Sequence, residues 1–177
     1  MWKPLIRCSV VGGVVVFLWM MVSWMVLPMH KSLINKFAEP DAVMSTVMQY
    51  APHDGIYVIP SCDSAQKGDK MRPEPFLFVN LRRDVVMGSM VEPIIMSIIT
   101  QMVGAFLITY LLLQAKAMKY WNRVWFVTVA GIAVAVIGLT PAGNWWHFPL
   151  PWVILEMFDM AVAWFLGGLV ISKLVKG

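Results

Sequence analysis

The stretch WVILEMFDMAVAWFLGG, residues 152–168, is apolar enough for the interior of a lipid bilayer, yet it contains two carboxylates. It belongs to an apolar run from Trp152 to Ser172, and a helix that crosses a bilayer needs about 20 such residues. Glu156 and Asp159 are three residues apart and therefore share one face of that helix. Ionisable groups inside a membrane usually face the interior of a helix bundle. The stretch therefore predicts a helical bundle with a polar site inside it.

Three further apolar runs precede this one, namely Cys8–Pro28, Pro93–Ala115 and Val124–Thr140. The 177-residue chain is 59% hydrophobic and 14% charged, whereas soluble domains are about 25% charged. The first run is too long for a cleaved signal peptide, and no small-residue cleavage site follows it, so we expect a retained anchor. The predicted fold class is an all-α membrane protein with four transmembrane helices.

The basic residues predict the orientation of these helices. With four spans, both termini and the loop KAMKYWNR, residues 116–123, lie on one side, and together they hold seven basic and no acidic residues. The segment 29–91 on the other side balances seven basic with seven acidic residues. Cytoplasmic loops carry the excess of Lys and Arg, so we expect both termini in the cytoplasm. This placement explains the net charge of +4 without a nucleic-acid partner.

Three regions follow along the chain. Residues 1–28 form the cytoplasmic N-terminus and the first helix, and residues 92–177 hold the other helices, at about 93–115, 124–140 and 152–172, with a short cytoplasmic C-terminus. Residues 29–91 are predicted to form a small periplasmic α+β cap. MHKSLINKF is expected to extend the first helix, Asp41 to cap a second helix, and GIYVIP and FLFVNLR to pair as antiparallel strands. Cys62 in this segment lies on the opposite side from Cys8, so the two cannot form a disulfide.

Several ionisable side chains are predicted to gather at the outer end of the bundle. Glu156 lies roughly 7 Å and Asp159 roughly 12 Å below the outer boundary at 1.5 Å per helical residue. Glu92 begins the second helix, His30 follows the first, and His147 lies in the turn between the third and fourth. Imidazoles and carboxylates together can bind a divalent metal or relay a proton. The alternative is that each has a separate role as a helix cap or an interfacial anchor.

The candidate metal ligands within that set are His30, His147 and Asp159, and the sequence identifies no metal or other cofactor. Met21, Met25 and Met29 recur at helical spacing beside His30, and thioethers are ligands for copper(I), but methionine is also a common apolar filler. No nucleophile or cofactor motif accompanies the carboxylates, so we do not expect an enzyme.

Small residues at a spacing of four predict close helix packing. The pairs are Gly131 with Ala135, Ala163 with Gly167, and Gly168 with Ser172. A stripe of Ser97, Gln101, Gly104 and Thr109 follows one face of the second helix. We interpret these residues as packing contacts rather than as a transport path.

The segments WMVLPMHKSLINKF, APHDGIYVIP, NWWHFPLPW and DMAVAWFLGGLVISK are similar to those of a group of uncharacterised bacterial four-helix inner-membrane proteins. The resemblance covers nearly the whole chain. It implies a location in the bacterial inner membrane, and it implies no activity or catalytic residue.

Two functional hypotheses of different classes follow. The first is an accessory, assembly or scaffold subunit of the inner membrane, which acts through a protein partner or as a homo-oligomer in the lipid bilayer. The second is a small oligomeric transporter, or a protein that handles metal ions or protons through the outer His and carboxylate residues. The convergence of His30, Glu92, His147, Glu156 and Asp159 would favour the second hypothesis.

Overall fold

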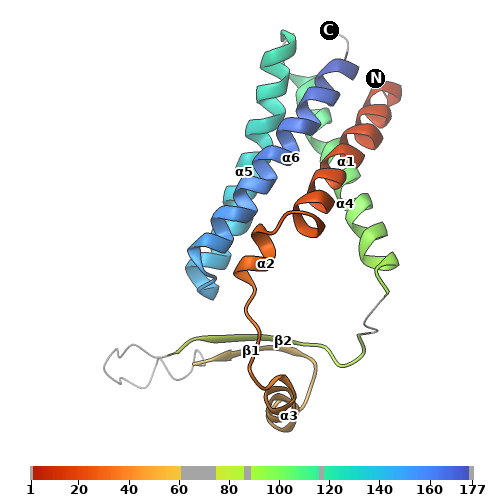
Figure 1. Cartoon of the computed structure of the whole chain (residues 1–177). Coiled ribbons are helices and arrows are strands. Elements are labelled where there is room, and N and C mark those ends of the chain that lie inside the picture. The colour runs from red at the N-terminus through yellow and green to blue at the C-terminus, as the bar shows by residue number, and fades with distance from the viewer. Residues whose placement is uncertain (1, 61–74, 86–88, 116–117, 176–177) are drawn as a thin grey trace. The chain divides into compact units, whose positions relative to one another are not determined.

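The computed structural model describes residues 2–60, 75–85, 89–115 and 118–175. It divides into two compact units, shown in Figure 1. The helical unit comprises Met1–Ile34 and Ser89–Gly177, and the hairpin unit comprises Asn35–Gly88. Cys62 and most of the predicted loop 61–75 lie outside the described residues.

The helical unit contains four helices long and apolar enough to cross a membrane, within the described part of the chain. They are α1 (Trp2–Met25), α4 (Val91–Gln114), α5 (Tyr120–Trp146) and α6 (Leu150–Leu174). The prediction of four long apolar helices is therefore confirmed, and the helices are consistent with a multi-pass membrane protein. Figure 1 shows the start of α1 and the end of α6 at the same end of the bundle.

α5 is longer than the predicted span of about 124–140, because it begins at Tyr120 and continues through Pro141 to Trp146. A proline inside a helix removes only one backbone donor, and the remaining hydrogen bonds are strongly favoured where water is scarce. Trp146 is the last helical residue, and His147 after it has a left-handed backbone with a φ of 51°. The N–H of Phe148 then donates to the carbonyl of Ala142 at 3.1 Å, which satisfies a terminal carbonyl of the helix.

The prediction that MHKSLINKF, residues 29–37, extends the first helix was wrong. α1 ends at Met25, and a separate short helix, α2 (Met29–Leu33), begins after Pro28. Proline restricts the residue before it to extended conformations, so a helix usually ends there. The break redirects the chain, and α2 packs against both α1 and α6.

Helix packing in this unit is a series of neighbours rather than a closed ring. α1 packs against α4 and α6, α6 packs against α5, and the contact between α4 and α5 is small. The core lies around Trp164, which is 3% exposed. Its side chain fits against Gly131, where an added Cβ would lie 2.2 Å from Trp164 Cγ. Glycine is therefore required for this close approach of α5 to α6.

The hairpin unit consists of α3 (Pro40–Tyr50) and the strands β1 (Gly55–Ile59) and β2 (Leu77–Leu81). The strands pair antiparallel, as predicted, with Tyr57 opposite Val79. The prediction that Asp41 caps α3 was wrong because Pro40 occupies the first helical turn and Glu39 is the residue before it. Proline favours that first position because its missing N–H would have no partner there.

Arg83, which follows β2, hydrogen-bonds to the segment between α3 and β1. Its guanidinium donates to Asp54 Oδ1 at 2.7 Å and to the carbonyl of Ala51. The guanidinium hydrogen bond, together with one from the Arg83 backbone N–H to Asp54 Oδ2, holds the pKa of the Asp54 carboxyl below its usual value.

Candidate functional site

His30 lies at the centre of a buried polar cluster in the helical unit. The first turn of α2 carries the imidazole, which is 1% exposed. Its Nε2 atom is 3.3 Å from Glu156 Oε1 and 3.3 Å from Asp159 Oδ2, and both carboxylates belong to α6. One nitrogen therefore lies between two carboxylates, at a separation where electrostatic interaction is strong.

Ser23 completes this group, which we call the His30 cluster (Ser23, His30, Glu156 and Asp159). The Ser23 hydroxyl on α1 donates to Asp159 Oδ2 at 2.6 Å, and neither side chain is exposed. A hydrogen bond to a carboxylate is stronger than one between neutral groups. The sequence hypothesis missed Ser23, and its only signal was an isolated hydroxyl near the end of an apolar run.

Two indole rings cover the imidazole. The Trp24 ring stacks on His30 with centroids 4.2 Å apart and planes 21° apart. The Trp152 ring meets His30 edge-on at 6.0 Å and Trp24 at 5.7 Å. An aromatic face attracts a cation, so this enclosure stabilises a protonated imidazole while it excludes water.

The number of protons sets the charge of the His30 cluster. With neutral imidazole and two ionised carboxylates, the net charge is −2, and two added protons make it zero. Burial of net charge is costly, whereas a paired and neutral arrangement costs much less. At 3.3 Å and an effective dielectric constant of about 20, each attraction of a carboxylate to an imidazolium is worth about 5 kcal/mol before desolvation. Electrostatic interactions at these distances are therefore strong enough to hold the three side chains together.

Several buried atoms of the cluster lack a hydrogen-bond partner within the described part of the chain. They include His30 Nδ1 and Asp159 Oδ1. His30 Nε2 is also without an aligned hydrogen bond, so its two 3.3 Å contacts are ion-pair contacts. Buried polar atoms are normally satisfied. The cluster thus has spare capacity to accept or donate a proton.

Exposure differs between the two carboxylates. The Glu156 side chain is 16% exposed, whereas that of Asp159 is fully buried. Glu156 is therefore the more accessible of the two carboxylates.

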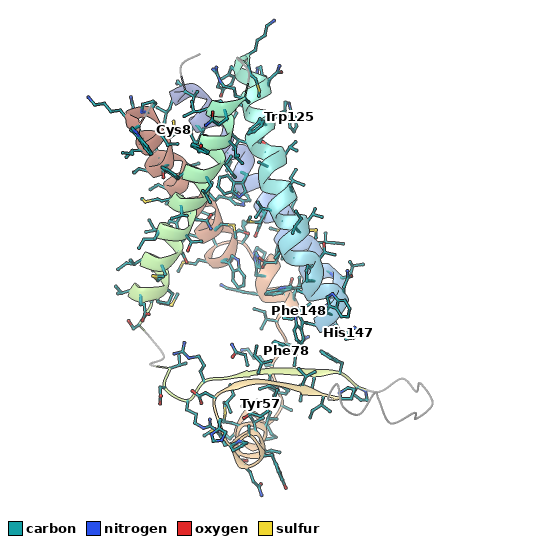
Figure 2. All side chains as sticks on the ribbon, turned by 180° about the vertical axis from the view of Figure 1, so that it is seen from behind. Cys8, Tyr57, Phe78, Trp125, His147 and Phe148 are labelled. Carbon is teal, nitrogen blue, oxygen red and sulfur yellow. The ribbon has the colours of Figure 1, made fainter. Side chains whose placement is uncertain are left out.

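Glu92 and His147, the other two predicted members, take no part in the ion pairs of the described cluster. Glu92 is exposed in the first turn of α4, where the helix dipole stabilises a carboxylate. His147 is exposed at the end of α5, at the end of the helical unit opposite Cys8 in Figure 2. Its left-handed backbone ends the helix. The structure therefore brings together three of the five residues.

Within the ranges that the structure describes, no group of three or more His, Cys, Asp or Glu side chains is arranged to hold a metal ion. The candidate ligand set of His30, His147 and Asp159 is not assembled, because His147 ends α5 away from the ion pairs.

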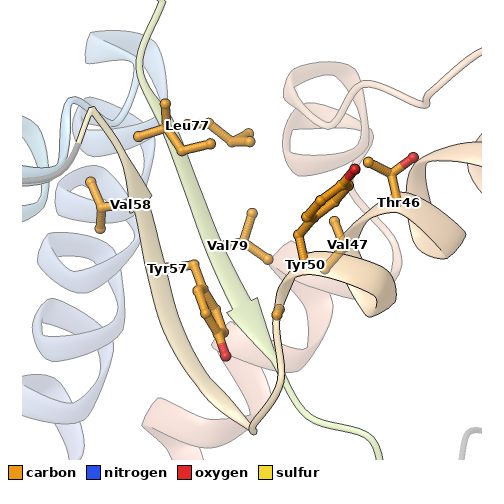
Figure 3. Close-up of a pocket in the computed structure, with 9 residues that line it drawn as sticks. Thr46, Val47, Tyr50, Tyr57, Val58, Leu77 and Val79 are labelled. Atoms are coloured by element: carbon orange, nitrogen blue, oxygen red, sulfur yellow. The ribbon is translucent and has the colours of Figure 1, made fainter.

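The hairpin unit contains a separate apolar cavity of about 350 Å³ between α3 and the two strands. Figure 3 shows Val47 and Tyr50 of α3 opposite Tyr57 and Val79 of the strands. The Tyr57 hydroxyl donates to the carbonyl of His53 at 2.7 Å. The cavity lining is mainly hydrocarbon, and its side-chain polar groups are the hydroxyls of Thr46, Tyr50 and Tyr57.

No family model, curated protein or solved structure matches the chain. The functional argument therefore rests on the geometry of the His30 cluster.

Proposed function

We propose that the protein is a multi-pass inner-membrane protein whose His30 cluster binds protons reversibly and responds to the pH of the outer compartment. The observation that supports this function is the placement of His30 Nε2 at 3.3 Å from both Glu156 and Asp159. Imidazole is the side chain that ordinarily changes charge near neutral pH. A buried imidazole between two carboxylates is a typical arrangement for a proton-dependent site.

The proton is exchanged at Glu156 and held between His30 and Asp159. Glu156 has access to the surroundings, and His30 contacts both carboxylates through the same nitrogen. Ser23 fixes the orientation of Asp159 by its hydrogen bond. Trp24 and Trp152 exclude water from the imidazole, so the proton load of the cluster depends on exchange through Glu156.

A proton-binding site fits the geometry better than a path across the membrane. Within the described part of the chain, the polar contacts of the cluster end at Ser23. The next buried hydroxyls, Thr109 and Ser172, have no hydrogen-bond partner in the described part of the chain, and apolar side chains surround them. The proposed response is therefore a change in the packing of α2 against α6 rather than proton transport.

Infrared difference spectroscopy of the protein in lipid vesicles tests the proton load. A pH step across the neutral range should change the carbonyl band of protonated carboxylic acid, and Glu156→Gln and Asp159→Asn should each alter that change. Glu92→Gln is the matched control, because Glu92 is an exposed carboxylate outside the cluster. Difference bands that are identical in the wild type and both cluster variants would contradict the proposal.

The location in the bacterial inner membrane and the cytoplasmic termini are part of the same proposal, supported by the excess of basic residues in the termini and the loop 116–123. A membrane-impermeant thiol reagent should label Cys62 from outside. Cys8 is buried, so its failure to react would not report orientation. Lys119→Cys in a Cys8→Ser background is the better control, because Lys119 is exposed. Labelling of residue 119 and not of Cys62 would contradict the proposed orientation.

An accessory or assembly role is the second candidate function. It is favoured by the tight contacts of small residues, such as Gly168, where an added Cβ would lie 3.0 Å from the Val124 carbonyl oxygen. A rigid bundle of this kind can serve as a docking element for other membrane proteins. Cross-linking at native abundance tests it, and recovery of the chain without any partner would count against it.

A further inference from the structure

α1 and α4 touch closely at one level and leave a groove at another. An added Cβ at Gly13 would lie 2.6 Å from Met102 Cα, and the Ser9 hydroxyl donates to the Met102 carbonyl at 2.7 Å. Between this contact and the Met25 and Met90 end of the two helices lies a groove of about 310 Å³. We call it the α1–α4 groove.

Most side chains that line the α1–α4 groove are apolar, and two are polar. Ser97 and Gln101 contribute the polar groups, and Met20, Met21, Met25 and Met90 are the most numerous apolar type. Methionine is unbranched and adapts its shape to a partner surface. The groove therefore offers a deformable apolar wall around a hydrogen-bonding group.

Gln101 lies far from both membrane surfaces. It follows Val91, the first residue of α4, by ten residues, which is about 15 Å along the helix at 1.5 Å per residue. The hydrocarbon core of a bilayer is about 30 Å thick, so the amide lies near the middle. The structure records no hydrogen bond of this side chain to any described residue, and it is only partly buried. An amide in hydrocarbon without a partner is costly.

We propose that the α1–α4 groove is the interface of a homodimer, in which Gln101 of one copy hydrogen-bonds Gln101 of the other. A primary amide carries both a donor and an acceptor, so two copies related by a two-fold axis satisfy each other. A lipid chain cannot form this hydrogen bond. Glutamine side chains that hydrogen-bond across helices are an established cause of helix association in membranes.

The exposure of α4 supports this occupant. Only 17% of its apolar window is buried within the helical unit, compared with 28–33% for the other three membrane helices. The side chains of Ser97 and Gln101 are one turn apart and share the same face. A second α4 placed on this face would cover both polar groups at once. Trp24 lines the groove and also stacks on His30, but the proposed hydrogen bond between the Gln101 amides involves no member of the His30 cluster, so the inference goes beyond the proposed proton site.

Cysteine cross-linking in native membranes tests the geometry. In a Cys8→Ser/Cys62→Ser background, Ser97→Cys should form a disulfide-linked dimer of twice the monomer mass. Val103→Cys is the matched control, because Val103 is exposed and lies almost opposite Gln101 around the helix. Cross-linking at position 103 but not at 97 would overturn the proposed face, and cross-linking of Ser97→Cys to a different protein would overturn the homodimer.

Energy transfer between labelled copies in vesicles tests the role of the amide. Gln101→Leu should raise the dimer dissociation constant roughly five- to thirtyfold, as expected for the loss of an interhelical hydrogen bond. Thr100→Val is the control, because its hydroxyl already donates to the Met96 carbonyl within α4. A dissociation constant that is the same for Gln101→Leu and the wild type would refute the proposal, as would an entirely monomeric wild type. The carboxyl infrared bands of Gln101→Leu should match those of the wild type, which separates this test from that of the proton site.

Discussion

Replacement of Asp159 by leucine should destabilise the helical unit, although it removes a charged group from an apolar environment. Removal of the carboxylate relieves an insertion cost of roughly 2.5–3.5 kcal/mol on membrane scales. It also leaves the buried Ser23 hydroxyl without its 2.6 Å acceptor, at a cost of about 1–3 kcal/mol, and removes one of the two carboxylates that face His30. Removing one partner of a buried ion pair typically costs about 3–5 kcal/mol. Together these costs exceed the relieved insertion cost, so we expect a net loss of roughly 1–5 kcal/mol.

Unfolding of the purified protein in mixed micelles, followed by circular dichroism, measures this loss. Asp159→Asn should be less harmful than Asp159→Leu, because the amide oxygen still accepts the Ser23 hydrogen bond. Ser23→Ala combined with Asp159→Leu should be more stable than Asp159→Leu alone, because the stranded hydroxyl is then absent. Glu156→Leu should cost less than Asp159→Leu, since Glu156 is partly exposed. Stability of Asp159→Leu equal to or above that of the wild type would refute the reasoning.

The close contact of α5 with α6 and the acid sensitivity of the hairpin unit give two further predictions. Gly131→Ala should destabilise the helical unit by about 1–3 kcal/mol in the same unfolding assay, because its Cβ would overlap Trp164, whereas Gly138→Ala, with nothing within 4 Å, should be neutral or stabilising. The Asp54 carboxyl has a lowered pKa in the folded state, so its contribution to stability is present above the unfolded-state value of about 3.9 and is lost as the pH falls through the folded value. As the pH is lowered, the strand amides should therefore lose more protection from hydrogen exchange in the wild type than in Asp54→Asn. An identical pH response of the two proteins would show that the pair of Asp54 with Arg83 does not stabilise the strands.

The number of membrane helices could be predicted from the sequence because bilayer thickness fixes the length of an apolar run. Their neighbours could not, since every helix is apolar on most of its surface and the faces carry little periodic signal. The extensive contacts of α1 with both α4 and α6, and the small contact between α4 and α5, depend on which small residues meet. The pairing of Gly131 with Trp164 is one such match, and sequence spacing alone does not indicate it.

The polar site was partly predictable for a related reason. A carboxylate inside a membrane costs so much free energy that it usually faces the interior of the bundle, and this predicts an interior position for Asp159. His30 contacts Asp159 because the chain changes direction at Pro28 and α2 turns the imidazole toward α6. The spacing of residues along a helix does not predict such a turn. The sequence predicted His147 at the same end of the bundle as His30, but its position is set by the left-handed backbone that ends α5. Ser23 resembled an ordinary packing residue until its acceptor was known.

Nuclear magnetic resonance of the His30 imidazole nitrogens in lipid vesicles can decide whether the cluster binds a proton. The chain has three histidines, so His53→Gln/His147→Gln leaves His30 as the single source of the signal. The proposed function predicts nitrogen shifts that follow the external pH reversibly and a titration that Asp159→Asn displaces. Imidazole signals that stay constant with pH, or that titrate identically with and without the Asp159 carboxylate, would contradict it.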